Sequence, residues 1–159
     1  MVINKTAKLI EKIFCYYKSL DFPDFTFVKE MIKSKPYDSL IKKIGCLFDI
    51  EETTDVNDDV SFCYIIKKNE SQWVIELSML GLYAVVFRIT DDGGAELLVS
   101  PINQQEEKIA YLLNEYGFER LSENILKQPV NLRLNNTEPE NTCFYQAFFS
   151  DTDQLPWVT

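Results

Sequence analysis

Residues 60–90 read VSFCYIIKKNESQWVIELSMLGLYAVVFRIT, and this stretch decides the fold. Three runs within it, which begin near Val60, Trp73 and Tyr83, alternate between two sets of side chains. A period of two is typical of β-strands, because successive side chains in a strand point to opposite faces of the sheet. Both sets contain apolar residues, so we expect one well-covered face and one partly exposed face.

Turn-forming residues separate these runs. A polar turn at residues 69–72 follows the first run, and Gly81 predicts a turn or a bulge after the second. The sequence DDGG at 91–94 is typical of a hairpin, since glycine readily adopts the positive φ that such turns require. With residues 95–99 as the next strand, the stretch predicts an antiparallel meander of about four strands.

Three helices are predicted before this meander. Residues 4–20 place apolar side chains at helical spacing, and two shorter helices begin near Asp24 and at Pro36. Gly45 is expected to end the third helix, because glycine is common just past a helix C-terminus. The apolar positions of the first helix are Ile10, Ile13, Phe14, Tyr17 and Leu20.

A further helix is predicted at residues 103–116. Asn103 and Glu106 have the spacing of a capping box, and Gly117 follows as a stop signal. Residues 118–127 are expected to form another short helix, because their apolar side chains also recur at helical spacing.

The remaining apolar runs, at residues 46–50, 130–134 and 143–149, are short and are interpreted as strands. No linker, repeat or low-complexity segment divides the chain. The sequence therefore predicts a single α+β domain over residues 1–159. Its N-terminal helices and one or two later helices pack on an antiparallel β-meander of about four to six strands.

Charge is distributed unevenly along the chain. The 159 residues carry 16 basic and 25 acidic side chains, which gives a net charge of −9. Residues 1–45 have nine lysines against five carboxylates, whereas residues 46–159 have a net charge of −13. A body this acidic repels nucleic-acid phosphates and attracts basic proteins. We therefore expect a basic protein partner and no nucleic acid.

Cysteine usage indicates a cytoplasmic protein. The four cysteines lie far apart in apolar segments, without the close pairing of zinc ligands or the density of a disulfide framework. We expect four buried free thiols: Cys15, Cys46, Cys63 and Cys143. We see no signal peptide and no apolar run of membrane-spanning length, so we also expect no contact with a membrane.

The sequence contains no histidine. This removes Ser-His-Asp and Cys-His catalysis, histidine metal sites and the commonest general base near neutral pH. Neither glycine-rich phosphate-binding loop is present. Adjacent carboxylates at 58–59 and 91–92 lie in predicted loops, and no cation is predicted beside a cysteine to activate it. We therefore predict no enzymatic activity and no cofactor.

The densest group of carboxylates lies in residues 49–59, which we predict to be a polar loop. This segment has six acidic side chains and no basic one. Calcium binding is an alternative, since calcium prefers carboxylate ligands, but the spacing and the glycine of a calcium-binding loop are absent. A solvated acidic loop without a metal is the better interpretation.

Two segments resemble a known group of proteins. Residues 73–88 (WVIELSMLGLYAVVFR) and 143–151 (CFYQAFFSD) are similar to segments of small bacterial immunity proteins from contact-dependent inhibition and other polymorphic toxin systems. The shared features are an acidic α+β chain, a central aromatic hairpin and a C-terminal aromatic strand. The resemblance implies a tight, specific inhibitor of a cognate toxin domain, often a nuclease with a basic cleft.

On this hypothesis the protein neutralises its toxin through an acidic surface, as a monomer or a weak homodimer. The candidate contact residues belong to the acidic segment and to the C-terminal segment: Asp49, Glu51, Glu52, Asp55, Asp58, Asp59, Asp151, Asp153 and Trp157. Tryptophan is enriched at interface hot spots, but Trp157 can equally pack inward. The alternatives are an adaptor or chaperone for a secreted effector, with an exposed apolar sheet face, and an enzyme that uses carboxylates or a cysteine.

Overall fold

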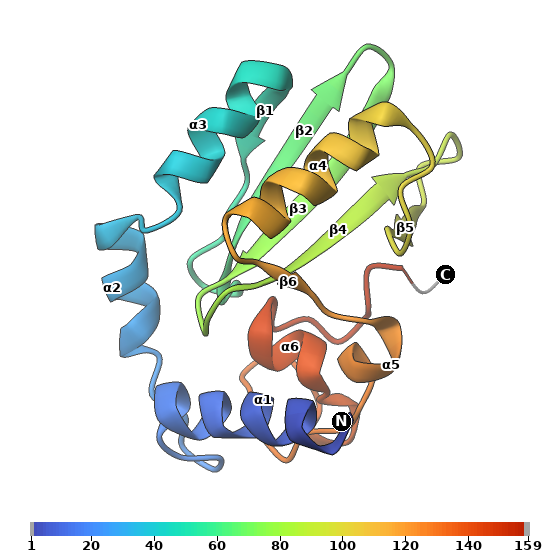
Figure 1. The fold of residues 1–159 in the computed structure, drawn as a ribbon. Helices are drawn as coiled ribbons and strands as arrows, with labels where there is room; N and C mark the ends of the chain where they lie inside the picture. Colours follow the sequence, from blue (N-terminus) through green and yellow to red (C-terminus); the bar gives the residue numbers. More distant parts are fainter. Residues whose placement is uncertain (1, 158–159) are drawn as a thin grey trace.

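The computed structural model describes residues 2–157, which form a six-stranded sheet and several helices and confirm the α+β class (Figure 1). The helices are α1 (Val2–Tyr17), α2 (Thr26–Ser34), α3 (Asp38–Leu47), α4 (Gln104–Glu115), α5 (Glu123–Leu126) and α6 (Phe144–Phe148), with a 3-10 turn η1 (Pro139–Asn141). The strands are β1 (Asp49–Glu52), β2 (Ser61–Lys68), β3 (Ser71–Ser78), β4 (Tyr83–Ile89), β5 (Ala95–Leu97) and β6 (Glu119–Arg120).

The sheet contains the predicted meander. Its order is β1-β2-β3-β4-β5 with antiparallel neighbours, and β6 pairs in parallel with the start of β4. Asn69 in the β2–β3 turn has a φ of 57°, and Gly93 in the β4–β5 turn has a φ of 84°. Asn and Gly adopt this left-handed conformation at the lowest cost, so the chain reverses direction where they occur.

Helix α4 lies across one face of the sheet (Figure 1). Trp73 marks this face, because its indole nitrogen donates a hydrogen bond to Glu106 Oε2 of α4 at 2.9 Å. The Arg88 guanidinium, on the same face by register, donates to both oxygens of Glu106 at 2.6 and 2.5 Å. The side chains that alternate with these therefore point to the opposite face.

This opposite face is covered at one end and partly exposed elsewhere. One row of paired residues crosses it from β1 to β5, in the order Glu51, Ile65, Val74, Phe87 and Leu97. Ile65, Val74 and Leu97 are half-buried, whereas Phe87 is buried. The face thus has an apolar centre with a carboxylate at the β1 edge.

Residues 143–149 form helix α6 rather than the predicted strand. Every side chain from 142 to 149 is buried, and a short run that is apolar on all sides has no period that distinguishes a strand from a helix. Gln146 determines the local structure, since its Oε1 accepts a hydrogen bond from the Cys143 backbone N–H at 2.9 Å. This is the reciprocal half of a capping box, which stabilises the start of a helix.

The helix predicted at 118–127 is confirmed only for residues 123–126, and the strand predicted at 130–134 is wrong. Gly117 has a φ of 83° and redirects the chain after α4, so residues 119–120 form β6 beside β4. Helix α5 begins only after Ser122, whose hydroxyl accepts from a backbone N–H in the first turn. Residues 130–134 form no strand, because their backbone bonds are irregular single contacts with α1–α2 and η1 neighbours.

Two boundaries near the acidic segment differ from the prediction. Helix α3 continues through Gly45 to Leu47 and ends where Phe48 adopts an extended conformation (φ −136°, ψ 154°). Strand β1 follows directly, so the first four residues of the predicted loop at 49–59 are an edge strand.

The buried stripe of helix α1 agrees only in part with the predicted one. Leu9, Ile13 and Tyr17 are buried, whereas Ile10 and Phe14 are largely exposed. The cysteines also differ from expectation: Cys143 is buried and Cys63 half-buried, but Cys15 and Cys46 are exposed.

Candidate protein-binding site

The acidic segment and the C-terminal segment meet in one pocket. The pocket has a volume of about 750 Å³ and lies where the β1–β2 loop approaches the chain that follows α6. Five acidic side chains from these two segments line it: Asp55, Asp58, Asp59, Asp151 and Asp153. Residues almost a hundred positions apart therefore build a single negatively charged concavity.

The pocket carboxylates also hold its loops in place. Asp59 accepts hydrogen bonds from the Asp55 backbone N–H and the Ser150 hydroxyl, both at 2.8 Å. Asp58 accepts from the Asn136 amide at 2.7 Å. Asp153 accepts from the backbone N–H of Glu138 at 3.1 Å. The partners are neutral donors, so the negative charge of the pocket is not cancelled.

Asp151 is the internal member of this group. Only 6% of its surface is exposed, and its oxygens accept from the backbone N–H groups of Asn135 and Asn136 and from the Thr137 hydroxyl. The hydrogen bonds of this carboxylate therefore hold the loop at 135–137. The structure therefore gives Asp151 a role in shaping the pocket wall.

Glu76 of β3 contributes a buried carboxyl group to the same pocket. Only 7% of its surface is exposed, and its Oε1 accepts a hydrogen bond from the Tyr145 hydroxyl of α6 at 2.8 Å. Burial, reinforced by the charge of Asp59 and opposed by the Tyr145 bond, raises the pKa of Glu76 from 4.5 to about 8. Burial also raises the pKa of Asp59. Burial thus favours the protonated form of both carboxyl groups.

Trp157 packs inward rather than projecting into solvent. Its ring stacks on Phe87 with centroids 5.7 Å apart and meets Tyr145 edge-on at 5.4 Å. It therefore covers part of the open sheet face at Phe87, beside the Tyr145 that bonds Glu76. Its indole nitrogen is buried without a hydrogen-bond partner among the described residues.

The remaining candidates lie on the edge strand. Asp49, Glu51 and Glu52 are exposed on β1, outside the pocket. Glu51 shares the open face with Ile65, whereas Glu52 points to the other face. Charged side chains on an edge strand also oppose pairing with other chains, which is a structural role for all three.

Sequence reasoning missed Glu76 and Tyr145 as members of this site. Glu76 was visible as a carboxylate inside an otherwise apolar strand, which is an uncommon position for a charged residue. Tyr145 carried no such signal, because its segment was predicted to be a strand. The convergence of residues 55–59 with 151–153 depends on the path of the chain through α6 and could not be read from spacing.

Comparison with protein-family models, curated proteins and solved structures finds none that matches the chain. Two further features are absent within residues 2–157. No three acidic or cysteine side chains there are arranged to hold a metal ion. None of the helices there has the length and apolar character required to cross a bilayer.

No carboxylate of the pocket forms an ion pair with another described side chain. The ion pairs between described side chains lie elsewhere, and those on the sheet join Arg88 to Glu96 and Glu106 and Glu119 of β6 to Lys5. None of them involves a carboxylate of the pocket or of β1. The pocket is therefore a concave anionic surface, and a cationic side chain can neutralise its charge.

Proposed function

We propose that this protein binds a basic surface of another protein through its acidic pocket and neutralises that protein, as an immunity protein neutralises a toxin domain. The observation that carries the proposal is the meeting of two acidic segments in one pocket without a basic residue among its lining. Such a surface accelerates encounter with a basic partner and selects against acidic ones.

The neighbouring sheet face supports the same proposal. Its apolar centre around Ile65 and Val74 is half-buried, and carboxylates lie at its β1 edge and in the pocket. Protein interfaces commonly have an apolar centre with a polar rim. A toxin domain with a basic cleft matches this arrangement in charge. The inhibitory role itself rests on the resemblance of residues 73–88 and 143–151 to immunity proteins.

The proposal is tested by capture followed by neutralisation. The tagged protein is immobilised, exposed to lysate of its source strain at low salt, and the stoichiometric partner is identified. The partner domain is then expressed alone and together with this protein. We expect a basic domain that arrests growth alone and is harmless in the presence of this protein.

Two matched variants distinguish binding through the pocket from an effect of the overall negative charge. The triple variant Asp55→Asn, Asp58→Asn, Asp153→Asn removes three pocket charges and keeps an oxygen acceptor at each position. The control Glu30→Gln, Glu70→Gln, Glu115→Gln removes the same charge from exposed sites elsewhere. We expect the first to weaken capture at least tenfold and the second to change it little. Equal effects would place the interface elsewhere, and a captured domain that is not toxic would contradict the inhibitory role.

A further inference from the structure

A second surface, on the other side of the sheet, exposes apolar side chains. Val99 is 72% exposed, Ile102 71% and Tyr111 65%, and all three belong to α4 or to the chain that leads into it. The Arg120 guanidinium reaches this place from β6 and donates hydrogen bonds to the carbonyl oxygens of Leu98 and Val99 at 3.2 and 3.4 Å. Large exposed apolar side chains on and next to one helix are a feature of interaction surfaces.

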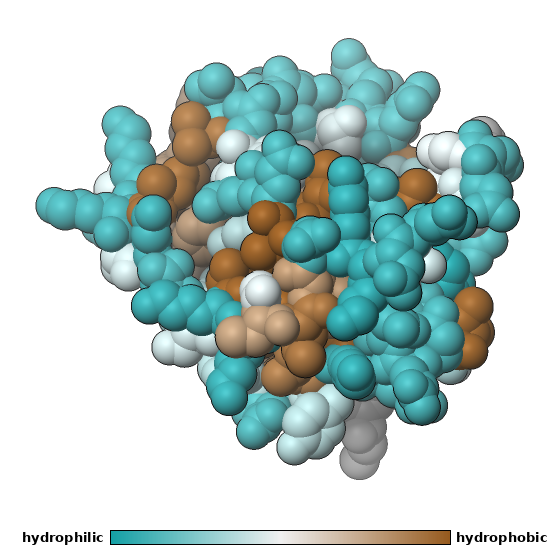
Figure 2. Space-filling model, turned by 90° about the horizontal axis from the view of Figure 1, so that it is seen from above, coloured by the Kyte–Doolittle hydropathy of each residue, from teal (hydrophilic) through white to brown (hydrophobic). Residues whose placement is uncertain are grey.

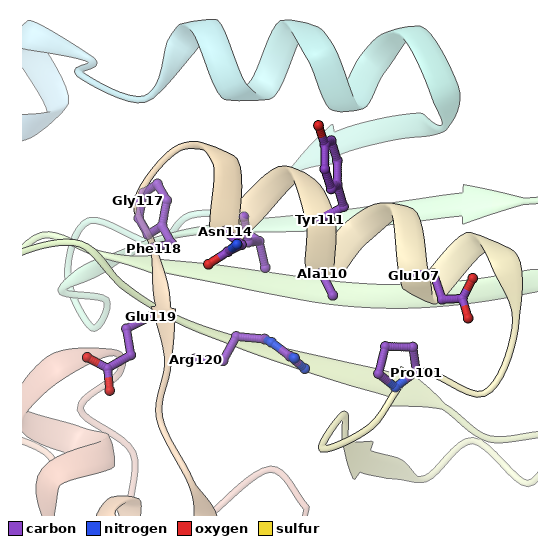
Figure 3. A pocket seen from close by; sticks show the side chains of 10 residues that line it. Pro101, Glu107, Ala110, Tyr111, Asn114, Gly117, Phe118, Glu119 and Arg120 are labelled. Atoms are coloured by element: carbon purple, nitrogen blue, oxygen red, sulfur yellow. The ribbon is translucent and has the colours of Figure 1, made fainter.

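Tyr111 is a ridge between two grooves. One groove, of about 660 Å³, runs beside α4 and is lined by Pro101, Tyr111 and Arg120 among others. In Figure 3, Tyr111 rises from one side of α4 while Arg120 lies at the other. The second groove, of about 550 Å³, is lined by Leu47 of α3 and by Tyr111 and Leu112. Figure 2 shows apolar side chains across the middle of the face seen from above, enclosed by hydrophilic ones.

A ridge next to a groove on the same surface is self-complementary. In a two-fold dimer the same patch serves both copies, so each protruding side chain must find a hollow in the identical patch of the partner. Helices satisfy this condition when side-chain ridges of one pack into grooves of the other. Tyr111 supplies the ridge, and the hollows on both sides of it supply the grooves.

Charge also favours a second copy at this surface. Arg120, Lys108 and Glu107 lie around the grooves, so both signs are present, and none of the three forms an ion pair among the described residues. An identical surface can therefore supply the opposite charge to each. The acidic pocket, by contrast, carries one sign and repels a copy of itself.

We infer that two copies of this chain associate through α4, with Tyr111 of each copy packed into a groove beside α4 of the other. The dimer leaves the acidic pocket free, because α4 lies across one face of the sheet and Glu76 points to the other. The inference does not depend on the proposed function.

Sedimentation equilibrium of the full chain over a wide concentration series tests this inference. We expect a reversible monomer–dimer equilibrium and no larger species, since a two-fold interface is closed. Tyr111→Ala should weaken the dimer at least tenfold, because a buried interface tyrosine is a common hot spot. Ile102→Ser should weaken it as well. Phe22→Ala, at an aromatic residue that is 83% exposed beyond α1, is the matched control and should leave the dimer unchanged.

Folding does not confound this test, since each substituted side chain is exposed and surface changes shift stability little. Thermal unfolding at a concentration below the dissociation constant checks this directly. A chain that remains monomeric throughout the series would overturn the inference. A dimer that tolerates both Tyr111→Ala and Ile102→Ser, or that weakens equally in Phe22→Ala, would also overturn it.

Discussion

Glu76 is the residue at which the acidic pocket and the core of the protein meet. Asp59 approaches it from the β1–β2 loop, the Cys63 thiol lies 4.0 Å from its Oε2 on β2, and the Tyr145 hydroxyl reaches it from α6. None of these groups is a cation. A buried carboxyl group in such surroundings is stable in its protonated form.

This position makes the stability of the fold depend on pH. The pKa of Glu76 is 4.5 when solvated and about 8 in the folded protein, so between these values the unfolded chain releases a proton that the folded chain retains. The contribution of Glu76 to stability is therefore complete below pH 4.5 and is lost as the pH rises to about 8. Replacement by glutamine, which does not titrate, should remove this loss.

We expect Glu76→Gln to be more stable than the unmodified protein at about pH 8, by roughly 1–3 kcal/mol, and to differ little near pH 4.5. Urea unfolding of both proteins at the two pH values measures the difference. The control is Glu70→Gln, at an exposed residue of the β2–β3 turn, which should not alter the pH dependence. If Glu76→Gln instead lowers stability by the same amount at both pH values, this result would contradict a protonated Glu76 in the folded protein.

At the scale of elements, the Glu106 side chain connects α4 to the sheet through hydrogen bonds. Burial alone would raise its pKa, but hydrogen bonds from Arg88, Trp73 and the Ile102 backbone hold that pKa below its ordinary value. The carboxylate thus joins one helix to two neighbouring strands. It is also part of the helix start, since its backbone N–H donates to the Asn103 side chain at 2.9 Å.

Removal of this side chain leaves a buried indole N–H and the Nε and Nη2 donors of Arg88 without their acceptor, while Arg88 Nη1 keeps its bond to Glu96. We expect Glu106→Ala to lower the free energy of unfolding by about 2–4 kcal/mol. The adjacent Glu107→Ala is the control, because Glu107 is exposed and forms no ion pair among the described residues, and it should change stability by less than about 0.5 kcal/mol. Chemical denaturation of the three proteins makes the comparison, and similar losses in both variants would show that Glu106 does not fasten α4.

Elements with a clear period were predictable from the sequence, and those without one were not. The alternation in residues 60–90 predicts β2, β3 and β4, and Asn103 and Gly117 bracket α4 as expected. The run at 143–149 is buried on all sides, so its helix could not be distinguished from a strand. The same limit applies to the candidate site. The acidic segment could be recognised in the sequence, but its proximity to Asp153 depends on the path of the chain through α6 and could not be predicted.

At the scale of the whole molecule, negative charge is concentrated at one end of the open sheet face. The nine lysines of the first 45 residues lie in or between α1, α2 and α3, whereas the pocket draws its five aspartates from residues 55–59 and 151–153. The repulsion among these aspartates opposes folding, because the folded state brings them together and the unfolded chain separates them. Salt should therefore stabilise this protein, since dissolved ions screen the repulsion.

We expect the free energy of unfolding to rise by about 1 kcal/mol or less between low and physiological salt, measured by urea denaturation in sodium chloride. The gain should be smaller in the variant Asp55→Asn, Asp58→Asn, Asp153→Asn, in which three of the repelling charges are absent. The variant Glu30→Gln, Glu70→Gln, Glu115→Gln has the same net charge, but its substitutions are dispersed over the surface. It should retain most of the salt response if the pocket is the source. An equal reduction in both variants would attribute the response to net charge, and the pocket would then be no more strained than the rest of the acidic surface.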